Sequence, residues 1–144
     1  MSPRWTEALL GLTLRGGSVY YLQDRSLTSP EPHYFVVVNL DPRGDDFLVM
    51  VVVSSNISGV HERFRNLPAS TLVEISPADY GTFTKQSIVD CNHFFRATKL
   101  ELLHKLQTGF ASECPQLQAG ILAKLRAGIL ASPLIEDEIK QMVL

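Results

Sequence analysis

The sequence predicts an α+β fold, with strands in the first two thirds of the chain and helices in the last third. Two apolar, β-branched runs at 33–40 and 47–54 enclose a turn, which is typical of a β-hairpin. Further along, Thr98 and Glu101 form a capping-box pattern, and apolar residues recur at helical spacing after Leu117. These three observations place the strands before the helices.

Length and composition are those of a globular protein. The 144 residues are 45% hydrophobic and 19% charged, so we expect one domain over residues 1–144. Within it, we expect a strand-rich part at about 16–96 and a helical tail at about 98–144. The formal net charge of -2 gives no dense basic face of the kind that wraps duplex nucleic acid, although local basic patches remain open.

The apolar runs and the cysteines indicate the cellular compartment. The longest apolar run, 47–53, is too short to cross a bilayer, and the N-terminal segment lacks the pattern of a secretory signal. We therefore expect a cytoplasmic protein without membrane contact. Cys91 and Cys114 are too few for a disulfide framework and are expected to be reduced thiols.

The first half of the chain is expected to form one short helix and three strands. Apolar residues three and four apart predict a helix over 5–14, which ends at Arg15-Gly16-Gly17. A strand rich in Val and Tyr follows at 18–23, and then a polar loop at 24–32. The two apolar runs come next. Because both are apolar at consecutive positions, we expect strands that are buried on both faces.

The second half adds two strands and three helices. Residues 56–70 are polar, residues 72–75 alternate as a half-buried strand, and 87–95 is a further strand candidate. One helix should begin at Thr98 and stop at Gly109, and two more should open at Cys114-Pro115 and Ser132-Pro133. The last helix has an apolar face that can pack on its own chain or on a second subunit. We favour packing of this apolar face on its own chain.

Candidate functional residues come from scattered positions, because no high-specificity catalytic motif is present. A zinc site at Cys91 and His93 is disfavoured, since a Cys-x-His spacing without a second cysteine pair is not that of a structural zinc site. We therefore expect no metal ion and no cofactor. A polar cluster follows the strand candidate, although a solvated turn is the plainer interpretation. Its members are Asp90, Asn92, His93 and Arg96.

The two long strands carry polar residues at the ends that a hairpin brings together. His33 begins the first strand, and Ser54, Ser55 and Asn56 close the second. A histidine beside hydroxyl donors can move a proton and steady an oxyanion, which is what cleavage of RNA by its own 2′-hydroxyl requires. From the pattern alone, the alternative that His33 only caps its strand is favoured.

Four short segments carry a family resemblance. They are Arg15 to Tyr21, Pro32 to Val38, Val51 to Asn56, and Ser87 to Cys91 leading into the helix after Thr98. Together they resemble the PemK/MazF-like toxins of bacterial toxin-antitoxin systems, whose fold is related to that of CcdB. The first segment is similar to the family's opening arginine-glycine and first strand, and the third to a strand that ends in threonine or serine.

The resemblance implies a small SH3-like antiparallel β-barrel with C-terminal helices. It implies the toxin of a type II toxin-antitoxin system, an endoribonuclease and hydrolase that binds single-stranded RNA and cleaves it by metal-independent acid-base catalysis. The expected partners are an antitoxin protein and a second copy of the chain in a homodimer. The catalytic residues are then expected to be His33, Ser54 and Ser55, and the substrate-binding residues Arg96, Asn56 and Arg43.

One departure from the family pattern leaves a second function open. The family has an arginine at the start of the second strand, in the neighbourhood of His33 here. A guanidinium stabilises phosphate charge at any pH, whereas His33 can act only when charged or as a proton donor. The alternative is a non-catalytic protein-interaction domain on the same fold. Other cations are scattered and are most often solvated charges: Arg43, Arg63, Arg65, Lys85 and Arg96.

Overall fold

The computed structural model describes residues 4–23 and 31–144. Most of the loop expected at 24–32 lies outside the described residues. The elements in chain order are α1 (Glu7–Thr13), β1 (Val19–Leu22), β2 (His33–Val37), β3 (Leu48–Ser54), α2 (Ile57–Arg63), the 3₁₀ helix η1 (Ala69–Thr71), β4 (Leu72–Ile75), β5 (Ser87–Asp90), β6 (Phe95–Ala97), α3 (Lys99–Gln107), β7 (Ala111–Cys114), α4 (Ala119–Ala131) and α5 (Asp137–Val143). The α+β prediction is confirmed.

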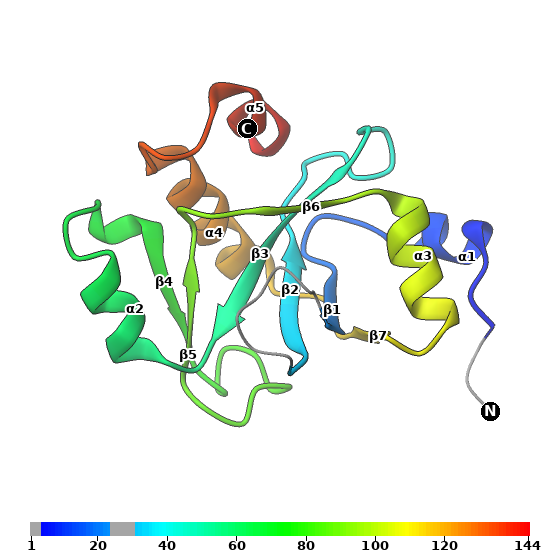
Figure 1. Ribbon diagram of the computed structural model, residues 1–144, viewed down its shortest axis with the longest axis horizontal. Helices are drawn as coiled ribbons and strands as arrows, with labels where there is room; N and C mark the ends of the chain where they lie inside the picture. Colours follow the sequence, from blue (N-terminus) through cyan, green and yellow to red (C-terminus); the bar gives the residue numbers. More distant parts are fainter. Residues whose placement is uncertain (1–3, 24–30) are drawn as a thin grey trace.

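The strands form one antiparallel sheet of seven strands among the described residues (Figure 1). Their order is β4-β5-β3-β2-β1-β7, and β6 pairs with β3 outside this path. β4 and β7 are the two edges, and no pairing joins them within the described ranges. The sheet is therefore open in its hydrogen bonding, and the closed SH3-like barrel is not confirmed.

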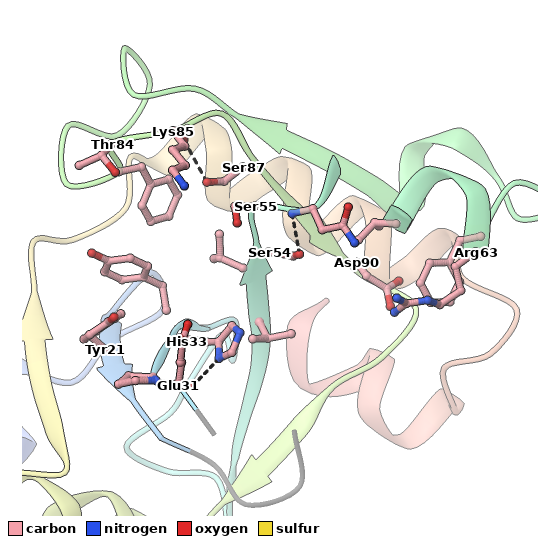
Figure 2. Close-up of a pocket in the computed structure, with 18 residues that line it drawn as sticks. Tyr21, Glu31, His33, Ser54, Ser55, Arg63, Thr84, Lys85, Ser87 and Asp90 are labelled. Carbon is pink, nitrogen blue, oxygen red and sulfur yellow. Dashed lines mark hydrogen bonds between the residues drawn. The ribbon is translucent and has the colours of Figure 1, made fainter. Parts of the chain in front are cut away.

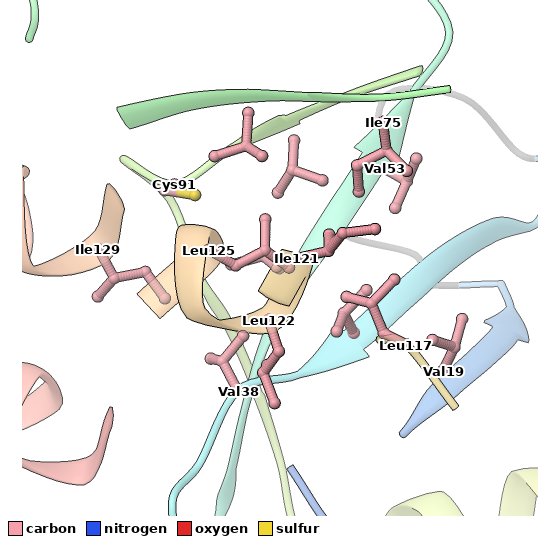
Figure 3. Packing of buried hydrophobic residues seen from close by; sticks show 14 of the residues in the cluster. Val19, Val38, Val53, Ile75, Cys91, Leu117, Ile121, Leu122, Leu125 and Ile129 are labelled. Atoms are coloured by element: carbon pink, nitrogen blue, oxygen red, sulfur yellow. The ribbon is translucent and has the colours of Figure 1, made fainter. Parts of the chain in front are cut away.

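The two central strands are buried on both faces, as their consecutive apolar residues predicted. One face packs against α4 and α5, in a cluster that includes Val53 and Leu125 (Figure 3). The opposite face packs against α1 and α3, which lie side by side in Figure 1, in a cluster that includes Leu48 and Leu102. Alternate residues of β2 and β3 thus belong to two separate hydrophobic clusters.

The helix predicted after Thr98 begins at the expected capping box. Thr98 Oγ1 accepts a hydrogen bond from the Glu101 N–H at 3.1 Å, and the Glu101 carboxylate accepts one from the Thr98 N–H at 3.0 Å. Gly109 has a positive φ of 82°, which suits the end of the helix. None of the helices in the described parts of the chain is both long and apolar enough to span a membrane.

The structure differs from the sequence prediction at several segments. The helices expected to open at Cys114-Pro115 and Ser132-Pro133 begin later, at Ala119 and Asp137. Residues 111–114, in the expected helical tail, form strand β7, because they pair with β1 through a distant contact that local pattern does not reveal. The polar stretch 56–70 contains the short helix α2. The strand candidate 87–95 is divided into β5 and β6 by a turn.

The last helix packs within its own chain. Ile139 and Val143 are buried in the same cluster as α4. The backbone N–H of Leu40 also donates to the carbonyl of Met142 at 2.8 Å, which ties the segment between β2 and β3 to α5. The favoured alternative for this helix is therefore confirmed.

Candidate functional site

The pairing of β2 and β3 places His33 and Ser54 at the same end of the sheet. The strands are antiparallel, and the last pair in their register is Phe35 opposite Val52. Beyond Val52, β3 stays paired with β5, where Ser54 lies opposite Ile88. The start of β2 and the end of β3 therefore separate, and the two predicted residues flank the opening.

A cavity of about 610 Å³ lies where β2 and β3 separate (Figure 2). The predicted residues His33, Ser54, Ser55 and Asn56 all line it. The cavity's other polar and charged walls come from β1, β2, α2, β5 and the segments before β2 and β5: Tyr21, Glu31, Tyr34, Arg63, Thr84, Lys85, Ser87 and Asp90. The structure thus brings together four of the six predicted site residues.

His33 is held in one orientation by the main chain. Its Nδ1 lies 2.9 Å from the carbonyl oxygen of Glu31, as the dashed line in Figure 2 shows. Because a carbonyl oxygen only accepts, Nδ1 carries a proton and donates it. Nε2 is then the nitrogen through which His33 can accept or deliver a proton.

The hydroxyl residues across the opening belong to the turn from β3 into α2. Ser54 Oγ accepts a hydrogen bond from the Asn56 backbone N–H at 3.1 Å, which leaves the hydroxyl hydrogen to donate. Asn56 Oδ1 accepts from the Gly59 N–H at 3.2 Å and caps α2. Ser55 is exposed at the cavity wall. Ser54 and Ser55 therefore offer hydroxyl donors, while Asn56 stabilises the turn.

The cavity carries charges of both signs. Arg63 at the end of α2 and Lys85 before β5 supply cations, and Glu31 and Asp90 supply carboxylates. Asp90 is engaged by its own turn, because its Oδ2 lies 2.7 Å from Nδ1 of His93. Among the described residues, neither Arg63 nor Lys85 forms an ion pair. Arg63 lies over Phe64 at a longer distance, with Cζ 5.8 Å from the ring centroid. With no described carboxylate paired to them, Arg63 and Lys85 can face an anion such as a phosphate group.

Three aromatic rings that sequence reasoning missed form one side of the cavity. Tyr21 lies opposite Tyr34 in the register of β1 and β2, and Phe83 lies next to Tyr34. We call these three residues the aromatic wall. Burial, and then the neighbouring Cys114 and Tyr21, raise the pKa of the Tyr34 phenol above its ordinary value. The sequence shows only a tyrosine in each of two strands, and the register is needed to show that they meet.

The two predicted substrate-binding arginines lie outside the cavity. Arg43 donates to the carbonyls of Leu14 and Leu12 at 2.9 and 3.0 Å, and so ties the β2–β3 turn to the end of α1. Arg96 lies over the ring of Phe47, with Cζ 4.4 Å from the ring centroid. In this structure both side chains make scaffold contacts.

The polar cluster after β5 connects three parts of the fold. Asn92 Nδ2 donates to Thr71 Oγ1 at 3.0 Å and to Asp90 Oδ1 at 2.9 Å, and Ser132 Oγ donates to Asn92 Oδ1 at 2.7 Å. These bonds join the β5–β6 turn to the end of η1 and to the end of α4, which is a structural role. Across residues 4–23 and 31–144, no group of three or more His, Cys, Asp or Glu side chains is arranged to hold a metal ion.

Comparison with solved structures identifies the fold. The chain is similar to an endoribonuclease from Mycobacterial species in complex with its cognate antitoxin, with 13% identity over 81% of this chain and 91% of that chain, and a TM-score of 0.52. It is similar to the Mycobacterium tuberculosis toxin MazF-mt6, with 10% identity over 78% and 91% of the two chains and a TM-score of 0.50. A further endoribonuclease from Mycobacterial species has 15% identity over 83% and 93%, with a TM-score of 0.52. No protein-family model and no curated protein matches the sequence.

At these identities the likeness establishes the fold and not the chemistry. The chain has the fold of MazF-type toxins, and the resemblance to the PemK/MazF-like family is confirmed at that level. Activity has to be inferred from the cavity and the groups that line it.

Proposed function

We propose that this chain is the toxin of a type II toxin-antitoxin system and cleaves single-stranded RNA in the cavity between β2 and β3. One observation carries the proposal: His33, Ser54 and Ser55 line one cavity at the point where their strands separate. The fold shared with endoribonuclease toxins supports it. The proposal includes an SH3-like curvature of the sheet, a homodimer, an antitoxin partner and a cytoplasmic location.

The reaction is metal-independent transesterification of the RNA backbone. The 2′-oxygen attacks the adjacent phosphorus as its proton leaves, and the bond from phosphorus to the 5′-oxygen breaks. The products are a 2′,3′-cyclic phosphate and a 5′-hydroxyl. His33 has only Nε2 left for this chemistry, because Nδ1 donates to Glu31. Protonated Nε2 delivers its proton to the leaving 5′-oxygen, and solvent takes the 2′-hydroxyl proton.

Hydroxyls and cations stabilise the phosphate as its charge grows. Ser54 and Ser55 donate hydrogen bonds to the non-bridging oxygens, and Arg63 and Lys85 provide permanent positive charge in the same cavity. These two cations compensate for the guanidinium that the family pattern places near His33. We assign no substrate contact to Arg43 or Arg96, since both are engaged outside the cavity.

Induced expression in a bacterial host tests the proposal. The wild-type chain should arrest growth and fragment total RNA on a gel, and His33→Ala should do neither, because the proton donor is lost. His104→Ala is the matched control, since His104 is exposed on α3 and does not line the cavity. It should arrest growth as the wild type does.

The contrary outcome favours the interaction domain. Normal growth and intact RNA from abundant, folded wild-type protein would contradict cleavage. Arrest that persists unchanged in His33→Ala would remove His33 from the mechanism.

A further inference from the structure

The aromatic wall extends from the hydrophobic core to the open side of the cavity. The ring centroids of Tyr21 and Tyr34 lie 4.6 Å apart, and those of Tyr34 and Phe83 lie 5.0 Å apart. Phe83 is only 4% exposed, whereas Tyr21 is 39% exposed. The wall therefore ends in one accessible tyrosine ring that is supported from behind by the other two.

The wall is held rigidly by its surroundings. Tyr80 packs against Phe83 with centroids 4.7 Å apart, and its hydroxyl donates to the Pro115 carbonyl at 2.6 Å. Tyr21 lies on a strand that is paired on both edges, with Tyr34 on one side and Ser112 on the other. Because the rings are fixed in advance, a planar ligand would order few side chains on binding.

Cationic and hydroxyl groups share the cavity with these rings. His33 precedes Tyr34 in β2, and Lys85 follows Phe83 in the loop before β5. Figure 2 shows Tyr21 on one side of the drawn cavity and Ser54 and Arg63 toward the other. Aromatic faces next to cations match single-stranded nucleic acid, in which unstacked bases alternate with phosphates.

We propose that Tyr21 is the platform on which one unpaired base of the RNA stacks, with Tyr34 and Phe83 supporting its ring. This inference rests on the proposed function and names the part of the substrate that the cavity holds. Stacking tolerates all four bases, because each has a π face, but it requires a base that is free of its own duplex. The platform thus selects single-stranded RNA without fixing its sequence.

Binding of a 2′-O-methyl RNA hexanucleotide tests the platform, because this probe has no 2′-hydroxyl and is not cleaved. Its affinity for the full chain is measured by fluorescence anisotropy. We expect Tyr21→Ala to bind about 5- to 150-fold more weakly, because stacking of one base on an aromatic ring contributes about that much to the affinity. Tyr21→Phe keeps the ring and should bind as the wild type does. Leu12→Ala, an exposed apolar position outside the cavity, should also leave affinity unchanged.

An abasic scan shows whether the ring meets a base. One abasic position in the hexanucleotide should weaken binding to the wild type and have little further effect on Tyr21→Ala, since the same contact is already lost. If the abasic position and Tyr21→Ala weakened binding by amounts that simply add, Tyr21 would not contact that base, and the platform would be overturned. Equal affinity of folded wild type and Tyr21→Ala for the intact probe would overturn it as well.

The platform and the proposed cleavage can fail separately. A wild-type chain that binds the probe through Tyr21 but cleaves no RNA would refute cleavage and retain the platform. Cleavage by the wild type together with unchanged probe affinity in Tyr21→Ala would refute the platform alone.

Discussion

The two ends of strand β3 differ although they belong to one continuous apolar run. Near its start, Met50 is paired with Val37 of β2 on one edge and with Phe95 of β6 on the other. At its end, Ser54 is paired only with β5 and lines the cavity. Leu48 at the first end is fully buried, whereas Ser54 is half-buried.

This difference shows where the fold has room for polar chemistry. A strand that is paired on both edges and covered on both faces cannot admit a reactant. Where a strand is paired on only one edge, its side chains can reach solvent on the unpaired side. Hydrogen bonds to the remaining neighbour still fix its backbone. Changes at the buried end should therefore lower stability, and changes at the open end should lower cleavage.

Leu48→Ala at the buried end has the largest expected effect. It should lower the free energy of unfolding by about 2–5 kcal/mol, because the truncated side chain leaves a hole between β3 and α3. Urea denaturation measures this loss. Cleavage per folded molecule should stay unchanged, and a selective loss of cleavage at full stability would contradict the comparison.

Gly128→Ala tests the support beneath β5, the strand that holds the open end. A Cβ at Gly128 would lie 2.8 Å from the Ser70 carbonyl oxygen and 2.9 Å from the Cys91 sulfur. We expect the free energy of unfolding to fall by about 1–3 kcal/mol, because helix α4 must shift. Thermal or urea denaturation measures it.

Gly120→Ala is the matched control on the same helix. Gly120 has the same Ala-Gly-Ile-Leu-Ala surroundings in sequence, but nothing lies within 4 Å of an added Cβ. This change should raise the free energy of unfolding by up to about 1 kcal/mol, since alanine is the better helix former. Equal destabilisation by both changes would contradict the close approach at Gly128.

Ser54→Ala at the open end should separate cleavage from stability. The lost hydrogen bond to the Asn56 N–H costs about 1 kcal/mol of unfolding free energy. Cleavage should fall about 100-fold, because the change removes the hydroxyl that we propose donates to the reacting phosphate. Ser54→Thr keeps the hydroxyl and should restore most of the rate. If Ser54→Ala cleaved at the wild-type rate, Ser54 would have no role in the reaction.

The smallest expected effect is a difference in alkylation rate between the two cysteines. It reports whether β5 stays paired with the end of β3. Burial, and then the charge of Asp90, raise the pKa of the Cys91 thiol to about 12, so little thiolate forms at pH 8. Cys114 is partly exposed and should be alkylated at least about 10-fold faster. Comparable rates would show that β5 opens easily and that the end of β3 lacks a fixed neighbour.

The sequence predicted the elements that depend on local pattern. The hairpin at 33–54 follows from its β-branched runs and turn residues, and the helix after Thr98 follows from its capping box. The meeting of His33 and Ser54 could be predicted because hairpin geometry alone brings those ends together. Strand β7 could not, since its partner β1 is far away in the chain.

The rest of the candidate site depends on contacts that a linear pattern does not contain. Tyr21 and Tyr34 belong to different strands and lie 13 positions apart in the sequence, and only the register of β1 and β2 brings the rings together. The sequence suggests that Arg43 and Arg96 are available cations. In the structure, Arg43 donates to backbone carbonyls and Arg96 lies over the ring of Phe47. Arg63 and Lys85 lie in the cavity instead.

Cleavage of a labelled single-stranded RNA by the purified chain tests most directly whether the opening between β2 and β3 is an active site that works through His33. The reaction is run in EDTA, with His33→Ala at equal folded concentration and with analysis of the product ends. We expect fragments with 2′,3′-cyclic phosphate ends from the wild type, and cleavage at least about 100-fold slower from His33→Ala. Intact RNA with folded wild type, or equal cleavage by both proteins, would contradict the proposed site.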